Sequence, residues 1–171
     1  MRKVVLYIAA SLDGFIAEPE ESLDWLTNIE GQDDNGYAEF YETVDTILMG
    51  GRTYRWIMEH GEFPYEGKEC YVFSRQSQMD TEFVRFCQGG CTALVRELRG
   101  REGKDIWLEG GGELVRQFLN EHLVDEIILT IAPVILGKGI PLFSGLESET
   151  ALYLTEMKQY GQFAQLRYAC K

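Results

Sequence analysis

The chain has 171 residues, of which 45% are hydrophobic and 12% aromatic, so it can bury a full core and is expected to fold as one domain over residues 1–171. Its formal net charge of -12 argues against a nucleic-acid binder, because that class needs a basic surface. No apolar run approaches the ~20 residues that span a bilayer, so we expect no membrane partner.

The first apolar run follows two basic residues. Arg2 and Lys3 precede residues 4–10, an arrangement similar to a short signal peptide. An acidic stretch over residues 18–21 follows with no convincing cleavage site. We therefore predict that residues 4–10 form a buried central strand and that the protein is cytoplasmic.

Strands and helices then alternate along the chain. A polar loop over residues 11–35 is longer than most structureless connections, and such loops are often functional. After it, apolar spacing predicts helices over 37–44, 52–58, 92–99 and 112–119, and strands over 46–49, 69–73, 105–109 and 126–135. This alternation predicts a parallel sheet with helices on both faces.

The C-terminal part has a different pattern. Residues 151–160 and 163–169 flank the dipeptide Gly161-Gln162. Two strands around a short glycine turn form an antiparallel hairpin. The predicted fold class is therefore α/β, with a mixed, mostly parallel sheet that ends in a C-terminal antiparallel hairpin.

Two glycine-marked turns each join a predicted strand to a helix. Glycine lets backbone N–H groups approach a ligand, and a helix N-terminus offers unpaired N–H donors. Two such turns predict a ligand with more than one phosphate, which indicates a nucleotide cofactor. The candidate binding residues are Gly50, Gly51, Arg52 and Thr53 in the first turn and Gly110, Gly111, Gly112 and Glu113 in the second. For the first turn, a structural role with Thr53 as a helix cap is an equal alternative.

Other candidate residues have two interpretations each. Asp13 can bind a ligand or cap its own turn. Trp25, in the long loop, can stack on a substrate ring or anchor the loop to the core. Cys87 and Cys91 lack histidine partners at ligand spacing, so we expect no metal site and reduced cysteines.

The chain resembles the dihydrofolate reductase-like superfamily, in particular the reductase domain of riboflavin biosynthesis and its small stand-alone relatives. The matching segments, in the family's order, are residues 10–17, 23–26, 48–54, 74–75, 108–112 and 133–143. The ordered set is specific and covers most of the chain. The resemblance implies a dihydrofolate reductase-like three-layer fold, NADPH as cofactor and, commonly, a homodimer.

The resemblance also implies roles for individual residues. Ser74 and Arg75 match the dipeptide that meets the adenosine phosphate of NADPH, and the nicotinamide lies near Ala10. Both glycine turns contact the cofactor phosphates. On the substrate side the candidates are Trp25 and Lys138, the latter for a substrate phosphate. We assign catalysis to Asp13, because reducing a polar heterocycle needs a proton donor.

The sequence thus predicts an NADPH-dependent reductase of a small heterocycle or its ribosyl-phosphate derivative. The nearest named activity is that of 5-amino-6-(5-phosphoribosylamino)uracil reductase in riboflavin biosynthesis. Hydride transfer is the cofactor's own chemistry, so no protein nucleophile is required. Two alternatives remain: nucleotide binding without catalysis, and dihydrofolate reductase activity. An apolar strand over 127–131, near the antiparallel edge, adds a reason to expect a homodimer.

Overall fold

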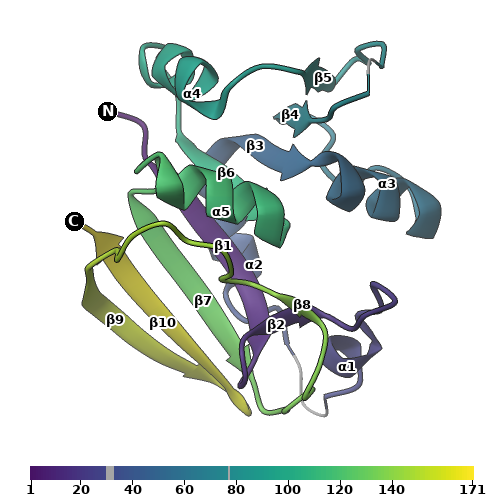
Figure 1. The fold of residues 1–171 in the computed structure, drawn as a ribbon, viewed down its shortest axis with the longest axis vertical. Helices are drawn as coiled ribbons and strands as arrows, with labels where there is room; N and C mark the ends of the chain where they lie inside the picture. The colour runs from purple at the N-terminus through teal and green to yellow at the C-terminus, as the bar shows by residue number, and fades with distance from the viewer. Residues whose placement is uncertain (30–32, 77) are drawn as a thin grey trace.

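An eight-stranded sheet forms the middle of the molecule in the computed structural model (Figure 1). The structure describes residues 1–29, 33–76 and 78–171; residues 30–32 of the long polar loop, and Ser77, lie outside the described residues. The strand order is β5-β4-β3-β6-β1-β7-β10-β9. The strands are β1 (Val4–Ser11), β3 (Val44–Gly50), β4 (Glu69–Phe73), β5 (Val84–Cys87), β6 (Asp105–Gly110), β7 (Glu126–Ala132), β9 (Leu152–Tyr160) and β10 (Phe163–Cys170).

The pairing directions confirm the predicted fold class. Every neighbouring pair from β5 to β7 is parallel, whereas β10 pairs antiparallel with both β7 and β9. The central strand β1 is an unbroken apolar run because it has a strand on each side and a layer of helices on each face.

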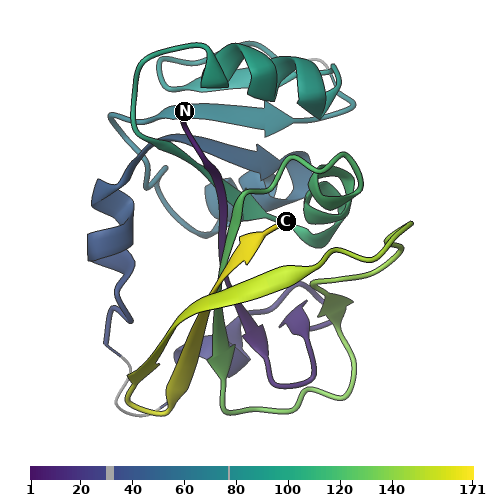
Figure 2. The same ribbon diagram turned by 90° about the vertical axis from the view of Figure 1, so that its left-hand side faces the viewer.

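Helices cover both faces of the sheet. On one face, α4 (Cys91–Arg99) and α5 (Gly112–Asn120) pack into the larger core cluster. On the other, α2 (Tyr37–Glu42) and α3 (Gly51–His60) supply Phe40, Tyr54 and Ile57 to a second cluster. In Figure 2, α2 (blue) and α5 (green) lie on opposite sides of the sheet.

Several predicted boundaries differ from the observed ones. The predicted strand 126–135 ends at Ala132, because Pro133 cannot donate to the ladder. The sequence reasoning missed β5, a short edge strand that pairs only with β4. The long polar loop contains β2 (Phe15–Ala17) and α1 (Asp24–Thr27), and β2 pairs antiparallel with β8 (Ile140–Pro141).

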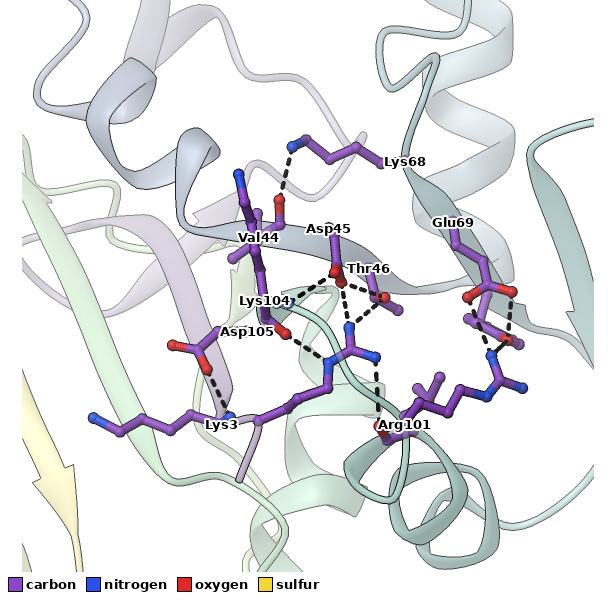
Figure 3. Close-up of polar contacts among 12 residues, drawn as sticks. Lys3, Val44, Asp45, Thr46, Lys68, Glu69, Arg101, Lys104 and Asp105 are labelled. Carbon is purple, nitrogen blue, oxygen red and sulfur yellow. Dashed lines mark hydrogen bonds and ion pairs between the residues drawn. The ribbon is translucent and has the colours of Figure 1, made fainter.

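A polar network ties the amino ends of the strands together (Figure 3). The buried Arg2 side chain donates to the carbonyl oxygen of Lys104 at 2.6 Å and to Thr46 Oγ1 at 2.7 Å, and it pairs with Asp45. Asp45 Oδ2 also accepts the Lys104 backbone N–H at 2.8 Å. These bonds join β1, β3 and the chain before β6 at the end of the sheet opposite the glycine turns.

The edge of the sheet opposite β5 lies two strands beyond β7. The apolar strand β7 pairs with β1 on one side and β10 on the other, and β9 forms the edge. Leu152, Tyr153, Leu154 and Met157 of β9 are exposed. No helix in the described part of the chain is long and apolar enough to cross a membrane.

Candidate active site

A cavity of about 770 Å³ opens at the carboxyl ends of the parallel strands. Its wall includes the ends of β3, β4 and β6, the first turns of α3 and α5, and part of β1. In open α/β sheets, ligands bind outside the carboxyl ends of the strands. Cavities of this size accommodate small ligands and cofactors.

The two glycine turns lie side by side in this cavity. The strands β3 and β6 are parallel neighbours, so the turns that follow them meet at the same edge of the sheet. A Cβ atom built on Gly50 would lie 3.7 Å from the carbonyl oxygen of Gly110. The N-cap residues of α3 and α5 are Gly50 and Gly111, which have no side chain to cap a helix, and Thr53 is the third residue of α3 rather than its N-cap. Two helix N-termini therefore present free N–H donors to one cavity, which suits a diphosphate.

The three consecutive glycines have three different surroundings. Gly110 has φ +120°, a conformation that favours glycine. A Cβ on Gly112 would lie 2.6 Å from the carbonyl oxygen of Pro141, so this glycine is required for packing. A Cβ on Gly111 would meet only Thr53 Oγ1 at 3.5 Å and Ile16 Cδ1 at 3.9 Å. Of the three, Gly111 is thus the one that lines the cavity without a steric or conformational requirement for glycine.

Arginines at this end of the cavity are paired with glutamates. Arg52 Nη2 lies 2.8 Å from Glu21 Oε1, and Arg75 Nη2 lies 3.1 Å from Glu113 Oε1. Both arginine side chains are exposed, so these ion pairs are weak and can exchange for a phosphate. Ser74, also in the wall, accepts the Gln76 backbone N–H at 3.1 Å.

Glu109 is the site residue that the sequence reasoning missed. It lines the cavity, and its Oε1 accepts the Tyr65 hydroxyl at 2.6 Å. Its Oε2 is shielded from solvent and has no hydrogen-bond partner in the described part of the chain. Desolvation raises the pKa of Glu109 to about 7. A carboxyl group that holds its proton near neutral pH can donate it to a ligand.

Aromatic side chains surround this carboxyl group. Trp107 and Tyr7 both line the cavity, and the Trp107 indole N–H donates to the carbonyl oxygen of Tyr7 at 3.0 Å. The Trp107 ring packs edge-on against Phe40 and Tyr65, with centroids 5.6 and 5.4 Å apart. Burial raises the pKa of Tyr7 to about 12. The arrangement is a rigid, largely apolar wall suited to a flat ring.

Most of the predicted cofactor residues lie together in this cavity. Its wall contains Gly50, Gly51, Arg52, Thr53, Ser74, Arg75, Gly111, Gly112 and Glu113. The wall residues do not include Ala10, Gly110, Trp25 or Lys138. Ala10 is buried in the core beside Ile8 and Ala9, which do line the cavity. Trp25 is half-buried on α1, between two leucines of the cavity wall, and Lys138 is exposed.

Asp13 also lies outside the cavity wall. Its Oδ1 accepts the Ser11 hydroxyl at 2.7 Å and the Leu136 backbone N–H at 3.1 Å, and its Oδ2 accepts the Gly137 N–H at 2.8 Å. These bonds, with that to Ser11 foremost, hold the pKa of Asp13 below its usual range. The contacts favour the alternative in which Asp13 caps its turn and joins it to the loop before β8.

Comparison with known proteins is consistent with this geometry. The model of the family described as RibD C-terminal domain matches residues 2–166. The uncharacterized protein YwjB of Bacillus subtilis is 49% identical over 170 residues, covering 98% of this chain and 97% of that protein. The crystal structure of a putative riboflavin biosynthesis protein from Shewanella sp. PV-4 superposes with a TM-score of 0.87 at 29% identity, covering 99% of both chains.

A more distant structure shows the same fold. It is a diaminohydroxyphosphoribosylaminopyrimidine deaminase/5-amino-6-(5-phosphoribosylamino)uracil reductase from Thermotoga maritima, which matches with a TM-score of 0.72 at 16% identity. The match covers 99% of this chain and 57% of that one.

Proposed function

This chain belongs to the RibD C-terminal domain family, and on that premise we propose that it is an NADPH-dependent reductase of a small heterocycle. The activity is of the type performed in riboflavin biosynthesis, because the Shewanella relative is called a putative riboflavin biosynthesis protein and the Thermotoga maritima relative carries a uracil reductase in its name. One observation carries the proposal: both glycine turns and the protonatable carboxyl group of Glu109 line a single cavity.

The residues present fit a dinucleotide. The free N–H groups at the starts of α3 and α5 would hold its diphosphate, with Gly111 leaving space for the approach. Arg75 and Ser74 would bind the additional phosphate of NADPH. When bound, this cofactor supplies a hydride.

The chain itself would handle the proton and exclude water. Tyr65 fixes one oxygen of the Glu109 carboxyl group, and Oε2, which is buried, has no hydrogen-bond partner in the described part of the chain. At neutral pH a substantial fraction of this group is protonated, so it can donate a proton to a ring nitrogen as the hydride arrives. Leu23 and Leu26 line the cavity from the long loop and limit the access of water.

Two measurements test this proposal. NADPH binding is followed by fluorescence titration, and turnover by loss of absorbance at the reduced-nicotinamide band with a panel of aminouracils and pterins. We expect tight NADPH binding and turnover that falls as the pH rises above about 7, because Glu109 then loses its proton. Glu109→Gln should retain NADPH binding and lose most turnover. NADPH binding without turnover of any compound would favour a nucleotide-binding protein instead.

We also propose that the protein is a homodimer that uses the β9 edge. Leu154 and Met157 are 55% and 71% exposed on this strand, and an edge strand with exposed apolar side chains is normally covered by a partner. Sedimentation should show a dimer at micromolar concentration. The double variant Leu154→Lys, Met157→Lys should sediment as a monomer, and a wild-type monomer would contradict the proposal.

A further inference from the structure

One part of the cavity carries almost no charge. We call it the apolar wall and define it as Tyr7, Ile16, Leu23, Leu26, Trp107 and Ile140. It comes from β1, β2, the long loop with α1, β6 and β8. Glu109, beside Trp107, supplies a carboxyl group whose Oε2 has no hydrogen-bond partner in the described residues. This surface therefore favours a flat ring with a nitrogen atom that can form a hydrogen bond with this carboxyl group.

Among the residues that the structure describes, the cations of the cavity wall lie elsewhere. Arg52 and Arg55 are on α3 and Arg75 follows β4, so they flank the glycine turns. The amino-acid sequence contains no lysine or arginine from Val4 to Gly51, although acidic residues are frequent there. That stretch provides β1, β2, the long loop and α1, which make up most of the apolar wall.

A phosphate on the substrate would lack a partner at this wall. Phosphate sites in proteins use arginine, lysine or free backbone N–H groups. In this cavity, those groups surround the glycine turns, where the cofactor's own phosphates require them. A substrate phosphate beside the apolar wall would instead meet an acidic chain segment without a cation, and a buried phosphate charge that has no partner opposes binding.

We propose that the substrate is a flat nitrogen heterocycle that carries no phosphate, recognised by the apolar wall and by a hydrogen bond between a ring nitrogen and the Glu109 carboxyl group. The proposal rests on the proposed reductase function and narrows its substrate class. It separates this protein from the activity named for the Thermotoga maritima relative, whose substrate is phosphoribosylated.

Calorimetric titration of the protein with a ribosylaminouracil and its 5′-phosphate tests the proposal. Titrations are made with and without NADP⁺. A failure of cofactor binding would overturn the proposed function, and it is thereby recorded separately from the difference in affinity between the two compounds. We expect the unphosphorylated compound to bind at least about tenfold more tightly at low salt, with a smaller difference at high salt. Equal or tighter binding of the phosphate, or binding of neither compound, would overturn the inference.

A variant that adds the missing cation provides a second test. Leu26→Arg should shift the ratio of the two affinities about tenfold toward the phosphorylated compound, because the lost apolar contact affects both ligands and the added cation pairs only with the phosphate. The matched control is Leu12→Arg, because Leu12 is 63% exposed and lies outside the cavity wall. NADPH titration of both variants checks that they fold. An equal response of the two ligands to Leu26→Arg would count against the electrostatic argument.

Discussion

Replacing Glu109 with glutamine should change how the stability of the protein depends on pH. Burial raises the pKa of this carboxyl group from its ordinary value of 4.5 to about 7 in the folded state. Between these two values the folded protein holds a proton that the unfolded chain has released, so the free energy of unfolding falls as the pH rises. The contribution of this proton to the free energy of unfolding is fully present below pH 4.5 and is lost as the pH rises through about 7.

The size of the effect follows from the two pKa values. Their difference, at about 1.36 kcal/mol per pH unit, corresponds to about 3 kcal/mol. Glutamine has nearly the same shape, can still accept the Tyr65 hydroxyl and does not titrate. The unfolding free energy of the variant relative to wild type should therefore rise by about 3 kcal/mol between roughly pH 4.5 and pH 8.5. For a chain of this length that corresponds to about 6–12 °C in the unfolding midpoint.

Urea unfolding at a series of pH values measures this difference. The general repulsion in a chain with a net charge of -12 affects both proteins equally, so it cancels in the comparison. Glu113→Gln is the matched control, because Glu113 lines the same cavity but its side chain is 64% exposed. Identical pH dependence of wild type and Glu109→Gln would refute the view that Glu109 is a buried, protonated carboxyl group.

Three further substitutions test the placement of the other site residues. Gly111→Val should abolish NADPH binding while the fold survives, because the valine side chain enters the cavity near Thr53. The control is Gly61→Val, at a position with no atom within 4 Å of the added Cβ, and this variant should bind NADPH normally. Titration of both variants decides whether Gly111 serves the ligand or only the turn. Arg75→Ala should weaken NADPH binding about tenfold and leave NADH nearly unchanged, and equal losses for both cofactors would remove Arg75 from the adenosine phosphate. Asp13→Asn should lower the thermal unfolding midpoint, because an amide nitrogen cannot accept the Gly137 N–H, and should keep most turnover. A loss of turnover of a hundredfold or so with unchanged NADPH binding would instead give Asp13 a role in the reaction.

The amino-acid sequence by itself determined most of the elements and the position of the two glycine turns. Apolar runs without alternation indicated the buried parallel strands, and the glycine turn at Gly161 indicated the antiparallel hairpin. The turns at Gly50 and Gly111 were found because glycine after a strand and before a helix has few structural uses. These signals are local, so neighbouring residues in the chain were sufficient to reveal them.

Only the tertiary structure decided which residues share the cavity. Glu109 stands in an apolar strand directly before a glycine turn, and that acidic residue in an apolar run was the one sequence signal available. Its raised pKa depends on burial and on Tyr65, which is 44 positions away in the chain. Asp13 was favoured as the catalytic group because the reduction needs a proton donor, but it accepts hydrogen bonds from Ser11 and from the Leu136 and Gly137 backbone, the latter two over 120 positions away. Desolvation and long-range hydrogen bonds arise only when distant segments pack together, and for that reason the proton-bearing carboxyl group emerged from the fold rather than from the motif.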